Sequence, residues 1–473
     1  MDEKRKYRWI VISSAFAAFM STLDSYIVNI SLPTIAKYFH VGVDKASLVT
    51  LSFFLFITST LPLVGKFVDK IGIKKVFITG YVIFTAGSFL CGIPPNLGML
   101  LMARCLQGIG GAMLVNSAYS AISAFLPKEI SGWGFSALSI AASLGITVGA
   151  PVGGFITGYF SWRWVFLINI PIGIIAMILA HRVLPESSPS DKKGHEKKSG
   201  FDFLGAIMSL VGLSLLVLGL NSGKVHGWAS ITVISMFISS ALVLTFFVFW
   251  EKRQAEPLID LNLLKRPSFA FASISTFLAF AFISGNAFIL PFYLETLKGL
   301  KAQQAGMVMM IWSVVYMITN FFSGRLSDKI DTSILCASAM ISAGASALFF
   351  SFALGYSGLT ATVIFLAWMA VSYAMFVAPN NKHVLGMSLP GEQGITSGFY
   401  NTMSRLGLTV GVCIFQAIFS HALPHHPETG THVHTLVPHE ALLSGFTHAY
   451  LAGVIICAGA FTFSMLGRTR KGE

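Results

Sequence analysis

Charged residues are scarce in this chain. Only 11% of its 473 residues are Asp, Glu, Lys or Arg, whereas 54% are apolar. An ordinary soluble domain has about 25% charged residues, and a soluble protein this apolar would expose large aggregating patches. The shortage of charge therefore argues against a soluble globular protein and predicts a chain that lies in a lipid bilayer.

Cysteine and cofactor motifs are also sparse. The five cysteines fall in apolar segments and form no closely spaced pairs, so we interpret them as packing residues and expect neither a disulfide scaffold nor a metal site. The sequence has no Gly-x-x-x-x-Gly-Lys-Ser/Thr loop for nucleotide phosphates. We therefore expect no cofactor and no enzymatic activity.

What the chain has in abundance is long apolar segments. A transmembrane helix needs about 20 mostly apolar residues. The first segment contains Asp24 and lacks a small-residue cleavage site, so it is interpreted as a span and not as a cleavable signal peptide. Fourteen helices are expected, at about 9–31, 47–65, 76–94, 98–122, 132–158, 163–184, 203–221, 230–250, 269–294, 304–323, 333–354, 358–379, 394–420 and 444–466.

Lys and Arg are unevenly distributed over the predicted loops. With the N-terminus placed in the cytoplasm, 24 of the 32 basic residues fall on the cytoplasmic side and six on the outer side, while Arg104 and Arg405 lie within spans. This asymmetry predicts a plasma-membrane protein with both termini in the cytoplasm. Because the net charge of +12 is spread over many loops, no nucleic-acid partner is expected.

A charged motif occurs twice and divides the chain. Residues 65–70 (Gly-Lys-Phe-Val-Asp-Lys) are echoed 259 residues later by 324–329, and Leu32-Pro33 is echoed 258 residues later by Leu290-Pro291. Two related bundles in series are typical of secondary transporters. We expect an N-terminal six-helix bundle over 1–184, a cytoplasmic linker over 185–202, two inserted helices over 203–250, a cytoplasmic connector over 251–268 and a C-terminal six-helix bundle over 269–473.

Five segments resemble motifs of the fourteen-helix drug:proton antiporters in the major facilitator superfamily. Residues 23–33 resemble the helix-1 signature, 65–72 the loop motif between helices 2 and 3, 104–112 the helix-4 motif, and 145–154 the helix-5 antiporter motif; 162–171 is also typical of this group. The resemblance implies an all-α major facilitator fold of two six-helix bundles with two additional helices. It also implies a monomer that exports hydrophobic or cationic drug-like compounds in exchange for protons by alternating access.

Asp24 is the leading candidate residue, because it is the one acid predicted well inside a span. A buried carboxyl can hold a proton or pair with a cationic substrate, but not both at once, which is the logic of exchange. The plainer alternative is a hydrogen bond that only holds the bundle together. The resemblance implies that Arg104 lies near Asp24 and takes part in proton coupling. We expect Gln107, one helical turn further on, and Asn29 to belong to the same group.

The resemblance also implies a gate at the cytoplasmic end of helix 2. There Asp69 would cap a helix of the second half, whose dipole favours negative charge at that end, and so hold the inner side closed. The alternative is a simple interfacial turn. The second copy departs from the pattern, since Asp331 stands where Gly72 stands in the first. The predicted gate residues are Gly65, Asp69, Lys70, Gly72 and Asp328.

Small residues on the fifth span suggest a close helix contact. Gly145, Gly149 and Gly153 recur every four residues and leave one face smooth enough for another backbone. Pro151 removes a backbone donor and can bend the helix. Together with Gly154, these residues predict a hinge or sliding surface between the two halves, with plain tight packing as the alternative.

The ninth span offers a tentative cavity. Phe282 and Asn286 indicate an aromatic wall with one polar contact, and Glu295 lies near the outer end. Plain packing and an interfacial charge are the alternatives. The outer segment 421–448 is rich in His, but its spacing matches no defined metal site, so we expect a solvated loop.

Two other functions remain open from the sequence. The first is proton-coupled transport of an endogenous metabolite such as an amino acid, a siderophore or a lipid-like molecule. The second is a membrane receptor or scaffold that transports nothing. Flux of labelled compounds with and without a pH gradient separates the three.

Overall fold

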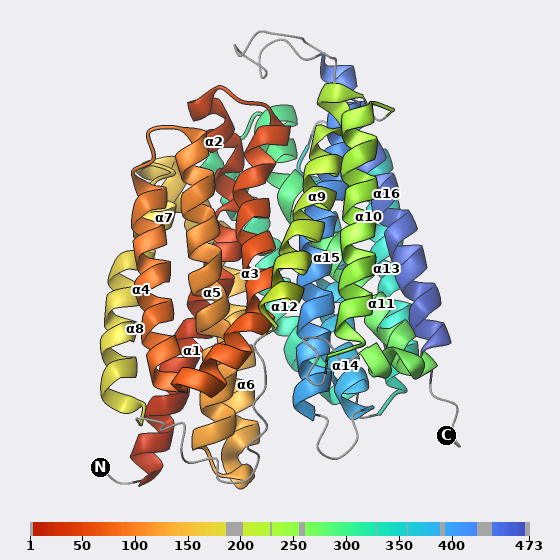
Figure 1. The fold of residues 1–473 in the computed structure, drawn as a ribbon. Helices are drawn as coiled ribbons and strands as arrows, with labels where there is room; N and C mark the ends of the chain where they lie inside the picture. The colour runs from red at the N-terminus through yellow and green to blue at the C-terminus, as the bar shows by residue number, and fades with distance from the viewer. Residues whose placement is uncertain are drawn as a thin grey trace. The chain divides into compact units, whose positions relative to one another are not determined.

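The described part of the chain is all-helical (Figure 1). The structure is a computed structural model that describes residues 3–185, 202–227, 229–254, 261–327, 329–356, 358–387, 393–422 and 438–468, apart from some side chains within the helices. Thirteen of its helical segments are long and apolar enough to cross a membrane, and a shorter apolar segment, Ile207–Leu220, forms part of a further helix. The fourteen predicted spans correspond to these fourteen segments.

The helices follow one another with short connections. The first half contains α1 (Glu3–Ile27), the 3-10 turn η1 (Asn29–Ser31), α2 (Leu32–Phe39), α3 (Val43–Ile71), α4 (Ile73–Gly92), α5 (Leu97–Phe125), α6 (Lys128–Tyr159), α7 (Trp164–Leu167) and α8 (Asn169–Val183). The inserted pair is α9 (Phe203–His226) and α10 (Ile231–Glu251). The second half contains η3 (Leu261–Lys265), α11 (Pro267–Phe292), the π-helical turn η4 (Tyr293–Leu297), α12 (Ala302–Leu326), α13 (Thr332–Ala353), α14 (Thr360–Gly386), α15 (Gln393–His421) and α16 (His439–Leu466).

Two compact units make up the chain. The first comprises residues 1–31, 48–214 and 240–258, and the second comprises 32–47, 215–239 and 259–473. In the first unit α1 packs on α6, α5 and α8, and in the second α11 packs on α15 and α16. The segment 32–47 and parts of α9 and α10 therefore lie in the second unit, across the domain boundaries that the repeat predicts.

Two predicted spans differ from the continuous helices that the sequence predicts. The first, expected over 9–31, ends too early, because the chain continues as α2 after the short turn η1. Pro33 lies in the first turn of α2, where a missing backbone N–H removes no helical hydrogen bond. The sixth span is broken at Ile168, between α7 and α8. The second interruption lies beside the polar network described below.

The internal repeat extends to the packing of α6 and α15. A Cβ atom on Gly145 would lie 2.8 Å from the carbonyl oxygen of Phe19 in α1, and one on Gly407 would lie 2.4 Å from that of Phe277 in α11. Phe277 follows Phe19 by 258 residues, the spacing of the repeated Leu-Pro pairs. The glycine face of α6 therefore packs on α1 within its own unit. These glycines therefore do not form the predicted sliding surface between the two halves. The alternative, plain tight packing, describes this face of α6.

The two copies of the charged loop differ in length. Gly72 is the one residue between α3 and α4, and its φ of 93° lies in the left-handed region that favours glycine. Its counterpart Asp331 caps α13 instead: its Oδ1 accepts a hydrogen bond from the backbone N–H of Ser333 at 2.9 Å. The departure from the motif therefore changes a one-residue turn into a longer connection with a side-chain cap.

Candidate functional site

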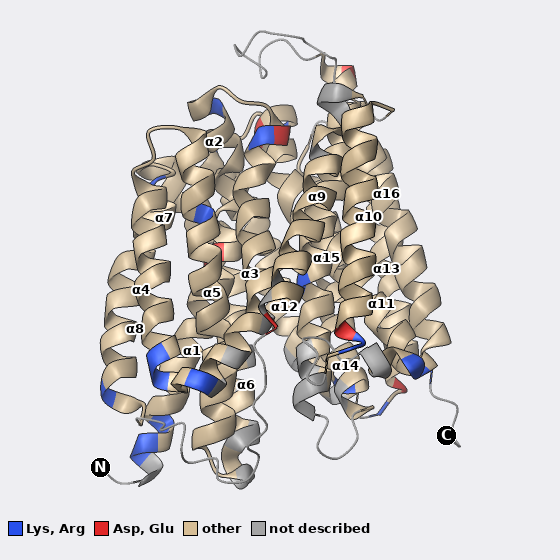
Figure 2. Ribbon diagram, in the orientation of Figure 1, with Lys and Arg blue, Asp and Glu red and all other residues tan. Residues whose placement is uncertain are grey.

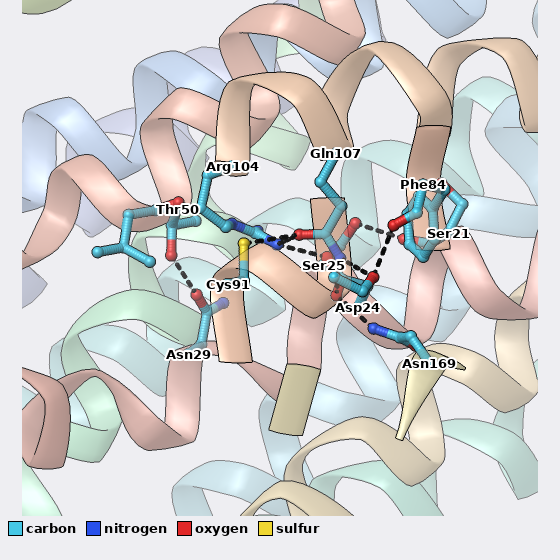
Figure 3. A network of polar contacts seen from close by, with 12 residues as sticks. Ser21, Asp24, Ser25, Asn29, Thr50, Phe84, Cys91, Arg104, Gln107 and Asn169 are labelled. Carbon is cyan, nitrogen blue, oxygen red and sulfur yellow. Dashed lines mark hydrogen bonds and ion pairs between the residues drawn. The ribbon is translucent and has the colours of Figure 1, made fainter. Parts of the chain in front are cut away.

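Asp24 lies in the last turn of α1, and its side chain is fully buried. The C-terminal end of a helix disfavours negative charge, and an unpaired buried ion is strongly destabilising. Arg104 on α5 offsets both effects. Its Nη1 atom donates to Asp24 Oδ2 at 2.6 Å, and it too is fully buried (Figure 3). The structure thus brings together two charges that are 80 residues apart.

Arg104 has other partners besides the carboxylate. Its Nε donates to the carbonyl oxygen of Val49 at 3.1 Å, and its Nη1 also donates to Gln107 Oε1 at 2.6 Å. Its guanidinium carbon lies 4.3 Å from the centre of the Phe53 ring, a cation–π distance. These contacts do not depend on the charge of Asp24, so they hold Arg104 in place when the carboxyl is neutral.

Gln107 connects the carboxylate to α4. Its Nε2 donates to Asp24 Oδ1 at 2.8 Å and to Ser88 Oγ at 2.8 Å. Its Oε1 accepts from Arg104 and lies 3.6 Å from the Cys91 thiol. Ser88 and Cys91 were not predicted as site residues. They are one turn apart on an apolar helix, and nothing in the sequence marks them beyond being small and polar.

Close packing of α4 and α5 sets these distances. A Cβ atom on Gly87 would lie 2.9 Å from the backbone nitrogen of Gln107, and one on Gly110 would lie 2.5 Å from that of Phe84. Larger residues at either position would therefore push the two backbones apart. The helix-4 motif thus supplies both the charged side chain and the small residue that lets α4 approach it.

Asn169 completes the shell of Asp24 and was missed by sequence reasoning. It is the first residue of α8, directly after the break at Ile168, and it is fully buried. Its Nδ2 donates to Asp24 Oδ1 at 2.8 Å (Figure 3). A signal was present, since an Asn followed by Ile-Pro within an apolar span is a candidate helix start with a buried polar group.

Three side-chain donors therefore surround one carboxylate. Oδ1 accepts from Gln107 and Asn169, and Oδ2 accepts from Arg104. Hydrogen bonds in which one partner is charged are stronger than neutral ones. Adding a proton at Oδ2 would remove the bond from Arg104, which retains Val49 and Gln107.

Other predicted residues lie away from this shell. Asn29 in η1 accepts from Thr50 Oγ1 at 3.0 Å and makes no hydrogen bond to Asp24 within the described part of the chain. In the second unit, Asn286 Oδ1 accepts from the Tyr450 hydroxyl at 3.1 Å. Phe282 is buried, with its ring centre 6.3 Å from that of Phe415. Asn286 and Phe282 thus pack on α16 and α15, as their plainer alternative predicts.

Glu295 forms a separate buried charge in the second unit. It lies in the π-helical turn η4, and its Oε2 is 3.7 Å from Lys37 Nζ of α2. The Lys37 side chain is 49% exposed, whereas that of Glu295 is only 4% exposed. The alternative that Glu295 is an interfacial charge in water is therefore wrong, because protein atoms cover its carboxylate.

The predicted gate is described only in part. Gly65 and Lys70 lie within α3, which continues to Ile71 beyond the predicted end at 65, so Gly72 alone forms the turn before α4; Lys70 is exposed. The Asp69 side chain and the whole of Asp328 lie outside the described residues. In α6, Pro151 and Gly154 lie within an uninterrupted helix. Four histidines of the outer loop, His425, His426, His432 and His434, also lie outside the description.

Charge marks one end of the first unit. Lys and Arg gather where α1 begins and where α3 and α8 end (Figure 2). Within the described residues, His, Cys, Asp and Glu form no cluster of three that suits a metal ion. The charged side chains of the first unit therefore gather at two places, this basic end and the buried network around Asp24.

Comparison with known proteins supplies relatives over nearly the whole chain. The riboflavin transporter RibZ of Clostridioides difficile is 30% identical over 91% of this chain and 92% of its own length. The fatty acid resistance protein FarB of Neisseria gonorrhoeae is 28% identical over 92% of this chain and 85% of its own. A protein of Salmonella newport named "Putative multidrug resistance protein MdtD" is also 28% identical, over 87% of this chain and 86% of its own.

Solved structures share the fold at low sequence identity. A bacterial homologue of the human lysosomal transporter Spinster, in an inward-facing unoccupied conformation, has a TM-score of 0.67 at 15% identity, over 98% of this chain and 99% of its own. The human organic anion transporter MFSD10 has a TM-score of 0.64 at 15% identity, over 97% of this chain and 99% of its own. The family model of the Major Facilitator Superfamily matches residues 14–412. This chain is a membrane transporter that belongs to the Major Facilitator Superfamily.

Proposed function

We propose that the protein is a proton-coupled antiporter that exports hydrophobic or cationic drug-like compounds across the plasma membrane. The observation that carries the proposal is the buried ion pair of Asp24 and Arg104, enclosed by Gln107 and Asn169. Buried intramembrane charges are expensive and mark ion pathways in transporters. A carboxylate that releases Arg104 when it binds a proton supplies the chemical step of coupling.

The driving force is sufficient for export. One proton moving through ~100 mV releases about 2.3 kcal/mol, and each pH unit adds about 1.4 kcal/mol. Together these terms sustain a concentration ratio of a few hundred for one uncharged molecule exported per proton. Both termini are proposed to be cytoplasmic, with the basic end of the first unit on that side. The protein is proposed to act as a monomer.

The loop between α3 and α4 is proposed as part of the inner gate. Gly72 allows a one-residue turn that places the charged end of α3 against the start of α4. Asp69 is the proposed gate carboxylate, and Lys70 is exposed beside it. The second copy of the loop has the capped connection at Asp331 and is proposed to serve as a fixed joint.

A second candidate is transport of an endogenous metabolite. It is favoured by one observation, namely that the relative RibZ is a riboflavin transporter and aligns with 91% of this chain. The same ion pair would serve either cargo, because the proton step is separate from cargo recognition. The difference between the two candidates therefore lies in the ligand alone.

Transport into proteoliposomes tests both candidates. Purified protein is reconstituted, a pH gradient is imposed, and uptake of ethidium, riboflavin and decanoate is measured in parallel with Asp24→Asn protein. Gradient-dependent uptake of ethidium that Asp24→Asn abolishes supports drug export, and the same result with riboflavin alone supports the metabolite transporter. Uptake that ignores the gradient, or that survives in Asp24→Asn, contradicts proton coupling through this residue.

A further inference from the structure

Two buried acids meet where the inserted helix pair begins and ends. Asp202 directly precedes α9, and Glu251 is the last residue of α10. These residues are only 5% and 1% exposed. Among the described residues no Lys or Arg forms an ion pair with Asp202, and the next residues after α10, Lys252 and Arg253, are exposed. Because a buried carboxylate is costly, proteins pair such groups with a cation or use them as metal ligands.

The two oxygens of Asp202 differ in their contacts. Oδ1 accepts hydrogen bonds from the backbone N–H of Gly205 at 2.9 Å and from the indole Nε1 of Trp250 at 2.8 Å. The first bond caps the start of α9, and the second joins it to the end of α10. Oδ2 is buried and accepts no hydrogen bond from the residues that the structure describes. Helix capping therefore accounts for one oxygen of Asp202 and leaves the other for a ligand.

The position of Gly205 shows that the two acids border the same place. A Cβ atom on Gly205 would lie 2.3 Å from Asp202 Oδ2 and 2.9 Å from Glu251 Oε1. The two oxygens therefore lie no farther apart than these two distances taken together. One Ca²⁺ ion can join oxygens across such a gap, because it binds each at about 2.3–2.6 Å. A side chain at position 205 would collide with both carboxylates, so glycine keeps this place free of side-chain atoms.

The donor set indicates the class of ligand. Carboxylate oxygens bind hard cations such as Ca²⁺ and Mg²⁺ in preference to soft ones. One divalent cation balances the charge of two carboxylates. Glu251 also ends α10, and the C-terminal end of a helix carries negative dipole charge that favours a cation. Charge, donor type and spacing therefore agree on one kind of ligand.

We propose that Asp202 and Glu251 bind a hard divalent cation that ties the start of α9 to the end of α10. The two carboxylates are the charged ligands, and backbone carbonyl groups or water complete the coordination, as is usual for these ions. Trp250 holds Asp202 in position through its other oxygen. With two charged ligands the Kd is expected to be on the order of 10⁻⁴–10⁻³ M. The site lies within the first unit and does not depend on the proposed transport function.

Terbium luminescence tests the site directly. Tb³⁺ is a hard cation that occupies the oxygen sites of Ca²⁺, and its emission is enhanced when it binds close to an excited indole ring such as that of Trp250. Purified full-length protein in detergent is titrated with Tb³⁺ under tryptophan excitation. Wild-type protein is expected to give saturable emission that CaCl₂ or MgCl₂ reverses and that KCl at equal ionic strength does not. Trp250→Phe should lose most of this emission, while its melting temperature still rises in CaCl₂.

Variants of the two acids identify the ligands. Asp202→Asn keeps a side chain that caps helices but lacks the charge, and Glu251→Gln provides a second, independent change. Each is expected to raise the Kd for Ca²⁺ by at least about tenfold. Asp331→Asn is the matched control, because Asp331 also caps a helix but is paired with Arg468, and its Kd should equal that of the wild-type protein. Thermal melting without added cation checks the fold of each variant.

Two results overturn the proposal. The first is equal Ca²⁺ affinity in Asp202→Asn, Glu251→Gln and wild-type protein, which means that the ion binds elsewhere. The second is wild-type protein with neither saturable emission nor a higher melting temperature in CaCl₂, as expected if a proton or a lysine side chain neutralises the two acids instead.

Discussion

Asp24 and Asn169 are 145 residues apart in the sequence, and the amide of one donates to the carboxylate of the other at 2.8 Å. The contact forms where α1 ends and α8 begins, so both helices place a terminus at the same buried point. The N-terminus of α8 carries positive dipole charge, which suits a carboxylate. The start of α8 at Asn169 therefore lies against the carboxylate of Asp24.

Removing that amide should weaken proton-coupled transport. Asn169→Leu deletes one of three donors to the carboxylate, and a hydrogen bond to a charged group contributes about 1.5–3 kcal/mol. Gradient-driven uptake should therefore fall by about tenfold or more. Asn380→Leu is the matched control, because Asn380 is a buried Asn that donates to Thr276 in the second unit. An equal loss of uptake in both variants would mean that Asn169 acts only on stability.

Removing one charge of the ion pair should destabilise the protein more than removing both charges. Arg104→Ala leaves Asp24 buried without its cation, and such changes destabilise by about 3–5 kcal/mol. The double variant Asp24→Asn, Arg104→Gln leaves no buried charge and should melt within a few degrees of the wild-type protein while losing coupling. Thermal melting in detergent measures this, and a double variant that melts as low as Arg104→Ala would show that the pair is needed for folding itself.

Close approach of α4 and α5 predicts intolerance to a single methyl group. Gly110→Ala would place a Cβ atom 2.5 Å from the Phe84 backbone nitrogen, so the helices must separate, at about 1–3 kcal/mol. Gly324→Ala is the control, since a Cβ atom there meets no atom within 4 Å and Ala favours a helix by about 1 kcal/mol. The melting temperature should fall in Gly110→Ala and rise in Gly324→Ala. A neutral Gly110→Ala would indicate that the helices relax easily.

The cap of α13 predicts a small acid-dependent loss of stability. Burial pushes the pKa of Asp331 upward, but hydrogen bonds from Ser333 and Arg468 outweigh it, and the folded pKa lies below its usual range. A lowered pKa stabilises the fold above the unfolded value of about 3.9, and the gain is lost as the pH falls below it. Asp331→Asn should therefore melt slightly below wild type at neutral pH, with the difference vanishing in acid. A difference in melting temperature that stays the same at every pH would assign the effect to packing.

The sequence predicts the ion pair and Gln107 but not the other residues around Asp24. Asp24 and Arg104 are visible because charge within an apolar span is rare and costly, and Gln107 follows from helical spacing. Asn169 was missed because contacts between distant helices leave no trace in local periodicity. Ser88 and Cys91 were missed because a small polar residue can satisfy itself within its own helix, as Ser88 also does with the Phe84 carbonyl.

The fold was predictable at the level of spans and not of their interruptions. Apolar length locates the helices, and the repeat indicates two related bundles. The turn at η1 and the continuation into α2 depend on tertiary contacts that composition does not carry. The glycine face of α6 was recognised as an interface, but its partner, α1, follows only from the three-dimensional packing.

The central claim is that Asp24 gains and loses a proton in the folded protein. Infrared difference spectroscopy across a pH titration of the reconstituted protein detects protonation of buried carboxyl groups directly. The account predicts a titrating carboxyl band in the wild-type protein that disappears in Asp24→Asn and persists in Glu295→Gln. A band that survives in Asp24→Asn and is lost in Glu295→Gln would contradict it.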